Sequence, residues 1–334
     1  MPKERFLVIG SNSFSGSHFI KRLIRNGYFT HGVSRSEQPN LAFLPYLWEK
    51  KIFIKDIFKF TKINLNKDIE QLIEIINIDE ITHVVNFAAQ GMVAQSWVTP
   101  EDWYKTNVVS QVEFHNRLRL NKNIAKYVHI TTPEVYGDTK GWIKEKDIFD
   151  PSTPYAVSRA ACDLHLKSFF KAYDFPVVFT RAANVYGPGQ QLYRIIPRSF
   201  LSALTGKKMD LHGGGSSIRS FIHIDDVTKA TLMLALEGEP GTTWHLSTTK
   251  SISIFDLVKK IFSITNSDFD DLVNIGEERL GKDQSYLLDS IKMRKRFNWS
   301  DKITLEEGLT ETKKWVSDNL SIFENFNWDY QHKK

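Results

Sequence analysis

The sequence predicts an α/β protein with a doubly wound parallel sheet and a smaller C-terminal lobe. Up to Arg181, short apolar segments alternate with helical patterns, and this alternation is typical of parallel sheets covered by helices. A glycine-bearing turn, residues 10–16, joins the first apolar segment to the first helix. After Arg181 the regular pattern ends, and glycine and proline punctuate the chain.

The elements follow from the spacing of apolar residues, which repeat every three or four positions in helices and form short runs in buried strands. Strands are predicted at residues 5–9, 29–34, 52–54, 83–87, 127–131 and 176–180. Helices are predicted at residues 15–26, 67–76, 103–120 and 155–173. We expect one domain over residues 1–182, joined by later strands near 220–248, and a ligand-binding lobe over residues 183–334.

The composition is that of an ordinary globular protein, with 41% hydrophobic and 25% charged residues among 334. No apolar run approaches the ~20 residues of a membrane helix, and no signal-peptide pattern follows Met1. Cys162 is the single cysteine, which suits a reducing compartment. We therefore expect a cytoplasmic protein that does not bind membranes or a metal. The net charge is +5, but the basic residues are scattered among 39 acidic residues. We therefore expect no nucleic-acid binding.

The turn at residues 10–16 indicates a Rossmann-type dinucleotide site, because it lies between a strand and a helix. Glycines permit a tight turn and close approach of a pyrophosphate, and the helix N-terminus adds free N–H groups. The residues of this turn expected to hold the cofactor are Gly10, Ser13, Phe14 and Gly16.

The end of the second strand bears on the choice of dinucleotide. An acidic residue there favours NAD, but the chain has Ser34 and Arg35, which suit a 2′-phosphate. NADP is therefore the favoured cofactor and NAD the alternative; an Arg35 that simply faces water is the other interpretation. The remaining expected contacts are Asp56 and Ile57 for the adenine, and Phe87, Ala88 and Ala89 beside the cofactor backbone.

A candidate catalytic set follows the fifth predicted strand: Thr132, Glu134, Tyr155 and Arg159. Tyrosine is a poor base at neutral pH, but a cation one helical turn away stabilises the phenolate. Tyr155 and Arg159 are four apart and share a helix face. Thr132 can bond a substrate hydroxyl, and Glu134 adds a second base. This set indicates redox chemistry on a sugar-like substrate.

These motifs resemble the extended short-chain dehydrogenase/reductase family, and within it the nucleotide-sugar 4,6-dehydratases of the dTDP-glucose and GDP-mannose types. The resemblance covers nearly the whole chain. Its motifs are the glycine turn and residues 86–90, 106–107, 131–137, 155–159, 181–188, 217–227 and 278–283.

The resemblance implies roles for individual residues. Thr132 would bond the sugar 4-hydroxyl, Tyr155 would start oxidation at C4, and Glu134 would take the C5 proton. Arg159 stands at the usual lysine and, with Tyr155 and Asn107, would contact the cofactor. The implied substrate contacts are Gln90, Ser96, Asn184, Arg198, His212, Arg219 and Arg279.

The implied reaction oxidises C4, eliminates water across C5 and C6, and returns hydride to C6. The product is a nucleotide-linked 4-keto-6-deoxyhexose, and the nicotinamide cofactor is regenerated in each cycle. The resemblance leaves the sugar and the nucleotide base open. It also implies a homodimer through a four-helix bundle built from residues 103–120 and 155–173, with a tetramer as the alternative.

Three residues depart from the pattern of the family. Arg159 replaces lysine, and its planar head needs different space. Pro133 stands where many thymidine-type enzymes have a proton-donating aspartate, so Glu134 would have to protonate the leaving hydroxyl. Ser13 replaces a glycine and would be strained if its φ were positive.

Two other functions remain open from the sequence. A nucleotide-sugar 4-epimerase would stop at the C4 ketone and would need no C5 base, so Glu134 argues against it. A catalytically impaired dinucleotide-binding scaffold would fit the departures at Arg159, Pro133 and Ser13. Tyr155 and Glu134 argue against the scaffold, because a scaffold needs neither.

Overall fold

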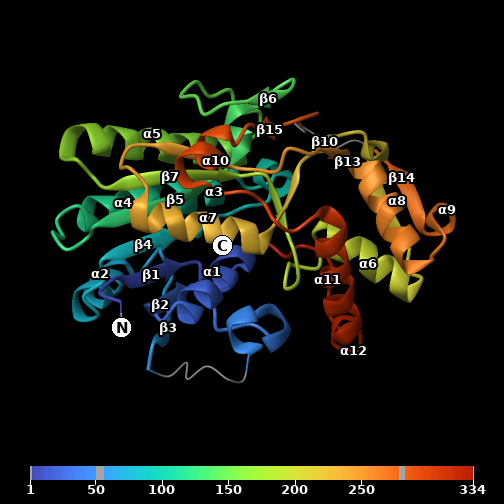
Figure 1. Cartoon of the computed structure of the whole chain (residues 1–334), viewed down its shortest axis with the longest axis horizontal. Helices are drawn as coiled ribbons and strands as arrows, with labels where there is room; N and C mark the ends of the chain where they lie inside the picture. Colours follow the sequence, from blue (N-terminus) through green and yellow to red (C-terminus); the bar gives the residue numbers. More distant parts are fainter. Residues whose placement is uncertain (1, 50–55, 278–282, 334) are drawn as a thin grey trace.

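A seven-stranded parallel sheet forms the centre of the computed structural model, which describes residues 2–49, 56–277 and 283–333 (Figure 1). The strand order is β12-β7-β5-β4-β1-β2-β3. The strands are β1 (Arg5–Ile9), β2 (Phe29–Ser34), β3 (Phe58–Lys62), β4 (His83–Asn86), β5 (Lys126–Thr131), β7 (Val177–Ala182) and β12 (Thr243–Leu246). The order reverses between β1 and β4, and ligands of such sheets bind at the carboxyl ends of the strands at this point.

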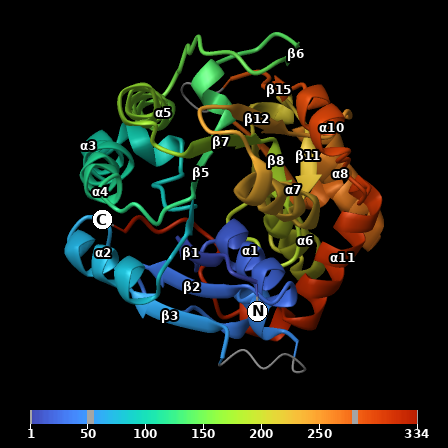
Figure 2. The same cartoon turned by 60° about the vertical axis from the view of Figure 1, so that its left-hand side comes forward.

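Helices cover both faces of the sheet. One face carries α1 (Phe14–Arg25) and α7 (Ile224–Glu237); the other carries α2 (Ile69–Ile78), α3 (Pro100–Tyr104), α4 (Ser110–Leu118) and α5 (Pro154–Tyr173) (Figure 2). Side chains alternate between faces along a strand. Phe6 and Val8 of β1 therefore belong to the cluster with α1, while Leu7 and Ile9 belong to the cluster with α2, α4 and α5. Both faces are buried, which explains why these strands read as continuous apolar runs.

A wide π-helical turn (Lys105–Val109) links α3 to α4. Such turns insert one residue into a helix and are frequent at functional sites. Here the turn contains Asn107, which is fully buried.

A second group of helices lies to one side of the sheet (Figure 1). Its core joins α6 (Ile195–Thr205), α8 (Ile254–Thr265) and α11 (Leu305–Asp318) through apolar residues of all three helices. Short sheets flank it: β8 (Asn184–Tyr186) with β11 (Phe221–His223), β9 (Met209–His212) with β14 (Val273–Gly276), and β10 (Ile218–Arg219) with β13 (Ile252–Ser253). The remaining elements are β6 (Trp142–Ile143), which pairs with β15 (Leu287–Leu288), and α9 (Phe269–Leu272), α10 (Ile291–Phe297) and α12 (Leu320–Phe323).

The predicted fold class is confirmed, and two strand predictions need correction. The strand expected at residues 52–54 lies outside the described residues, and the strand that pairs with β2 is β3, at Phe58–Lys62. Of the later segments, β12 rejoins the main sheet. The strand at Phe221–His223 does not, because it pairs with β8 in a separate two-stranded sheet.

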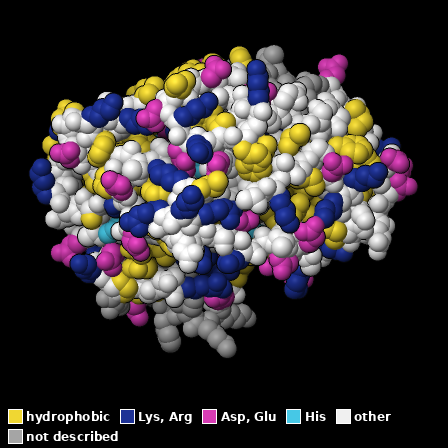
Figure 3. Space-filling model, turned by 45° about the horizontal axis from the view of Figure 1, so that its top comes forward, with side chains coloured by type: hydrophobic (Ala, Val, Ile, Leu, Met, Phe, Trp, Pro, Cys, Tyr) yellow, Lys and Arg dark blue, Asp and Glu magenta, His cyan; other side chains and the backbone are white. Residues whose placement is uncertain are grey.

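Within the described part of the chain, no helix combines the length and apolar character needed to cross a membrane. On the face shown in Figure 3, basic side chains are interspersed with acidic ones.

Candidate active site

The turn between β1 and α1 has the shape that a pyrophosphate requires. Gly10 has a φ of +82°, and a Cβ there would lie 2.9 Å from the backbone nitrogen of Ala88. A Cβ on Gly16 would lie 2.3 Å from the carbonyl oxygen of Gly10. Both positions therefore need glycine, and they bring the start of α1 close to the ends of β1 and β4. These residues fit a dinucleotide, which when bound supplies hydride transfer.

Ser13 is not strained, contrary to the concern raised by its replacement of a glycine. Its φ is −72°, and its Oγ accepts a hydrogen bond from Gly16 N at 3.1 Å. Ser13 is thus the N-cap of α1, a position for which serine is well suited. Phe14 begins the helix and is buried against His18.

The end of β2 does not present a free phosphate site. Ser34 Oγ accepts a hydrogen bond from Asn12 N at 2.9 Å, so this hydroxyl stabilises the turn between β1 and α1. Arg35 is exposed, and its Nη1 donates a hydrogen bond to the carbonyl oxygen of Lys333 at 2.7 Å. Arg35 therefore contacts the far end of the described chain.

Asp56 and Ile57 do not reach the cofactor edge, which corrects their prediction as adenine contacts. They precede β3, and the Ile57 carbonyl accepts a hydrogen bond from Thr30 N at 2.8 Å. Ligands of parallel sheets bind at the carboxyl ends of the strands, so the residues after β3 are the better candidates for adenine contacts. A cavity of about 220 Å³ lies there, lined by Asn64, Asn66, Lys67, Asp102, Lys105 and Thr106. The sequence missed Asn64, Asn66 and Lys67 because the third strand was expected too early.

The loop after β4 is held in place by Asn107. The Oδ1 of Asn107 accepts from Gln90 N at 2.8 Å, and its Nδ2 donates to the Gln90 carbonyl at 3.0 Å and to Ser158 Oγ at 3.0 Å. Asn107 therefore ties the ends of β4 and α5 together. Phe87 and Ala88 are partly buried beside the glycine turn, and Ala89 is exposed.

Thr132, Glu134 and Tyr155 lie together where β5 ends and α5 begins. A short 3-10 turn (Pro133–Tyr136) follows β5, and the Thr132 side chain caps it by accepting from Glu134 N at 3.3 Å. The Thr132 side chain also acts on the Tyr155 phenol and favours its ionised form. Tyr155 lies in the first turn of α5, which Thr153 caps. The structure thus brings together three of the four predicted catalytic residues.

Burial governs the ionisation of both candidate bases. Burial, reinforced by the nearby Asp283 carboxylate, raises the pKa of Glu134 to about 7, against the opposing effects of Arg219 and Arg194. Burial and the charge of Glu134 also raise the pKa of the Tyr155 phenol, and Arg159 only partly offsets this. Glu134 can therefore exchange a proton near neutral pH, as a carboxyl base requires.

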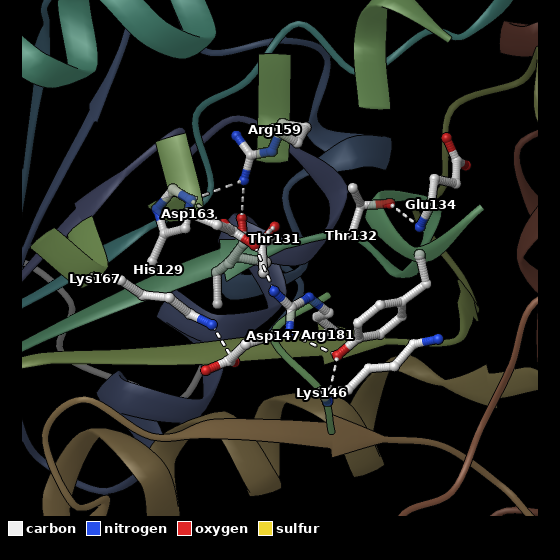
Figure 4. A network of polar contacts seen from close by, with 12 residues as sticks. His129, Thr131, Thr132, Glu134, Lys146, Asp147, Arg159, Asp163, Lys167 and Arg181 are labelled. Atoms are coloured by element: carbon white, nitrogen blue, oxygen red, sulfur yellow. Dashed lines mark hydrogen bonds and ion pairs between the residues drawn. The ribbon is translucent and has the colours of Figure 1, made fainter. Parts of the chain in front are cut away.

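Arg159 is the fourth predicted catalytic residue, and its guanidinium turns toward β5 (Figure 4). Only 2% of its surface is exposed. Nη2 donates to the Ile130 carbonyl and lies 3.4 Å from Nε2 of His129. Nε and Nη1 are buried with no hydrogen-bond partner among the described residues. Two donor nitrogens, with three N–H groups between them, therefore remain for a ligand at this point, which fits the hydroxyls of a cofactor ribose.

A buried ion pair stands behind Arg159. Asp163 Oδ2 accepts from Arg181 Nη2 at 2.6 Å and from Thr131 Oγ1 at 3.1 Å, and its Oδ1 lies 3.3 Å from His129 Nε2. Burial opposes ionisation of Asp163, but Arg181 and His129 outweigh it and lower the pKa to about 2. Burial lowers the pKa of His129. The neutral imidazole therefore leaves Asp163 as the counter-charge to Arg181.

The sequence missed two residues that face Glu134. Tyr286 lies beside the Glu134 carboxyl and favours its ionised form, and the Arg219 guanidinium lies 4.1 Å from the centre of the Tyr286 ring. Arg194 acts electrostatically on Glu134 and on Tyr155. Neither residue belongs to the motifs of residues 131–159. Tyr286 follows the late motif by only three positions, and that proximity is the signal that could have found it.

The other predicted substrate contacts divide into three groups. Ser96 is fully buried and donates to the Val93 carbonyl at 2.6 Å, so its prediction as a substrate contact is corrected. Arg219 donates to the carbonyls of residues 218, 283 and 284, at 2.7–2.9 Å. The positions that remain predictions are Asn184 on β8, His212 at the end of β9 and Arg198 on α6, whereas Arg279 lies outside the described residues.

Comparison with known proteins gives consistent matches over nearly the whole chain. The family model described as GDP-mannose 4,6 dehydratase matches residues 7–312. A mouse dTDP-D-glucose 4,6-dehydratase is 30% identical over 96% of this chain and 91% of its own length.

A trifunctional UDP-glucose 4,6-dehydratase, 3,5-epimerase and 4-keto-rhamnose reductase of Arabidopsis thaliana is 29% identical over 95% of this chain. The chain spans about half the length of this plant relative, 47%. Among solved structures, the dTDP-glucose 4,6-dehydratase DesIV of Streptomyces venezuelae, with NAD and TYD bound, superposes with a TM-score of 0.87. It is 25% identical, and the match covers 95% of this chain and 98% of DesIV.

Proposed function

This chain belongs to the GDP-mannose 4,6-dehydratase family, and we propose that it converts a nucleotide-diphosphate hexose into the 4-keto-6-deoxy sugar and water. The observation that carries the proposal is the proximity of Thr132, Glu134 and Tyr155 where β5 ends and α5 begins. A dehydrogenase would need only the phenol, whereas a dehydratase also needs a base for C5.

The roles follow from the geometry of this group. Thr132 bonds the 4-hydroxyl and holds it against Tyr155, whose ionised phenolate form, favoured by the Arg159 charge, takes its proton during oxidation at C4. The new ketone makes the C5 proton acidic, and Glu134, with a pKa of about 7, accepts it. Pro133 carries no proton to donate. Glu134 therefore returns its proton to the departing C6 hydroxyl, which leaves as water.

NAD is the cofactor that we propose, in place of the NADP favoured by Ser34 and Arg35. The related DesIV structure has NAD bound, and Arg35 is engaged by Lys333. The residues proposed to hold it are Gly10, Gly16, Phe87, Ala88 and Arg159, on the evidence of their positions around the turn between β1 and α1.

The proposal is tested by offering nucleotide-linked hexoses one at a time and following the products by mass spectrometry. We expect one donor to lose one water, with no net consumption of NAD. Interconversion at constant mass would instead identify a 4-epimerase. Absence of any product with every common donor would favour a scaffold without catalysis.

The elimination step should depend on pH through Glu134. Because this carboxyl must be ionised to accept the C5 proton, the rate should rise with pH and level off above about 7, the pKa of Glu134. One pH unit below that value only about a tenth of the carboxyl is ionised. Single-turnover formation of the 4-keto-6-deoxy product, measured at a series of pH values, tests this dependence.

Removing the charge of Asp283 should shift the pH midpoint of the elimination rate in a defined direction. Asp283 raises the pKa of Glu134, so Asp283→Asn should move the profile to lower pH. An unchanged midpoint in this variant, with unchanged thermal unfolding, would show that another group controls the elimination.

We also propose that α4 and α5 pair with the same helices of a second copy. Large apolar side chains are exposed on these helices and the segment before them: Val98 (78%), Val109 (61%), Val157 (37%) and Leu164 (54%). Trp103 and Phe114, by contrast, are fully buried and belong to the core. A four-helix bundle would bury the exposed set.

Leu164→Glu should convert the dimer to a monomer, because it places a charge in the apolar contact. Light scattering during size-exclusion chromatography measures the mass. Ile275→Glu is the matched control, since Ile275 is 62% exposed on β14, which does not belong to the paired helices. A monomeric parent protein, or a Leu164→Glu variant that remains a dimer, would contradict the proposed interface.

A further inference from the structure

We propose that residues 329–333, hereafter the strap, select NAD against NADP by engaging the Arg35 guanidinium through the Lys333 carbonyl oxygen. The inference rests on the proposed function, because it concerns the dinucleotide of that reaction. It starts from one observation: three predicted ligand-binding residues, Arg35, Gln90 and Arg198, are hydrogen-bonded or paired with this segment.

The strap begins at a fixed point on α6. Trp328 is only 9% exposed, and its ring lies 5.4 Å from the Arg198 guanidinium and 4.6 Å from Lys207 Nζ. Asp329 then pairs with Arg198 at 3.2 Å. Arg198 is therefore occupied by the chain itself, and the next residues leave α6 in a defined direction.

The strap crosses from the helical lobe to the sheet. Tyr330 packs edge-on against Tyr193, with ring centres 5.3 Å apart. His332 stacks on Trp103 at 5.0 Å and 11°, and its Nε2 lies 2.7 Å from Asp102 Oδ2. Figure 2 shows this segment as a red trace that ends beside α3 and α4. Asp102 also lines the cavity after β3, so the strap passes the adenine end of the candidate cofactor site.

The strap ends on two donors from the cofactor edge. The carbonyl oxygen of Lys333 accepts from Arg35 Nη1 at 2.7 Å and from Gln90 Nε2 at 2.7 Å. Arg35 follows β2, where dinucleotide folds recognise the adenosine ribose, and Gln90 follows β4. A carbonyl oxygen has two lone pairs, so this one atom is fully used in bridging the two strand ends.

The chemistry of the bridge disfavours a 2′-phosphate. A phosphate brings only acceptor oxygens and negative charge. At Arg35 it would lie against the Lys333 carbonyl oxygen, which is also an acceptor and cannot bond to it. A 2′-hydroxyl is neutral and can either donate or accept. The strap thus discriminates against NADP more than against NAD, although the residues after β2 are of the NADP type.

The test removes the strap and compares the two dinucleotides. A variant that ends at Trp328 keeps the buried anchor and frees the Arg35 guanidinium from the Lys333 carbonyl. Calorimetric titration should show the ratio of Kd for NADP to Kd for NAD falling by about tenfold or more, the scale of one charge-assisted hydrogen bond. Adding Arg35→Ala to the shortened chain should abolish this gain.

Milder variants guard against an effect of truncation on folding. His332→Ala removes the stacking on Trp103 and should lower the same ratio in part, whereas Gln331→Ala, at an exposed strap position, should leave it unchanged. An equal gain in affinity for both dinucleotides, or an unchanged ratio, would overturn the inference while NAD binding still supported the proposed function. Failure of all variants and the full chain to bind either dinucleotide would remove both proposals.

Discussion

Glu134→Gln should abolish water loss while leaving oxidation at C4 detectable. The amide keeps the size of the side chain beside Tyr286, but it cannot accept the C5 proton. General bases contribute roughly 10²–10⁴-fold to such steps, and we expect a loss of that size in the dehydration rate. Absorbance of the reduced nicotinamide should appear on substrate addition and persist, because hydride has no C6 acceptor.

The matched control is Glu74→Gln, at an exposed glutamate on α2, which should dehydrate at the parent rate. Exchange of the C5 hydrogen with solvent deuterium gives a second readout and should be lost only in Glu134→Gln. Normal dehydration by Glu134→Gln would show that the C5 base is another group.

Asp163→Asn should cost about 3–5 kcal/mol of unfolding free energy, the range for removing one partner of a buried ion pair. Asp163 and Arg181 are both fully buried, and their side chains are 2.6 Å apart. The asparagine keeps the shape but leaves the Arg181 cation without its counter-charge. Denaturant unfolding of parent and variant measures the difference.

The pH dependence of this difference has a defined sign. The folded pKa of Asp163, about 2, lies below its ordinary value of 3.8. Its contribution is therefore complete above about pH 4 and is lost as the pH falls through about 2. Asp147→Asn is the control, because Asp147 is 79% exposed in its pair with Lys167, and surface pairs contribute little. A loss in Asp163→Asn no larger than in this control would contradict the assigned role.

The sequence was sufficient for the features that depend on local pattern. Apolar runs located six of the seven strands of the main sheet, including β12, because strands buried on both faces have no polar alternation to obscure them. The glycine turn and the group of Thr132, Glu134 and Tyr155 were also found, since each is defined by residues close in sequence or by one helical turn.

The features that sequence could not supply depend on contacts between distant segments. Tyr286 meets Glu134 across about 150 positions of chain, and nothing local to either residue indicates this. The bond from Arg35 to Lys333 likewise joins residues 298 positions apart. Asp56 and Ile57 were misplaced because a strand predicted a few residues early moves every ligand contact to the wrong edge.

The guanidinium of Arg159, held beneath the sheet edge by the Ile130 carbonyl, has a consequence for alkaline behaviour. In enzymes with lysine at this place, the ammonium can itself lose its proton. The lysine and the tyrosine then both shape the alkaline side of the pH–activity profile. A guanidinium keeps its charge throughout the range in which proteins stay folded. The positive charge that Arg159 places near Tyr155 is therefore constant. The alkaline side of the pH–activity profile then follows the ionisation of the Tyr155 phenol alone.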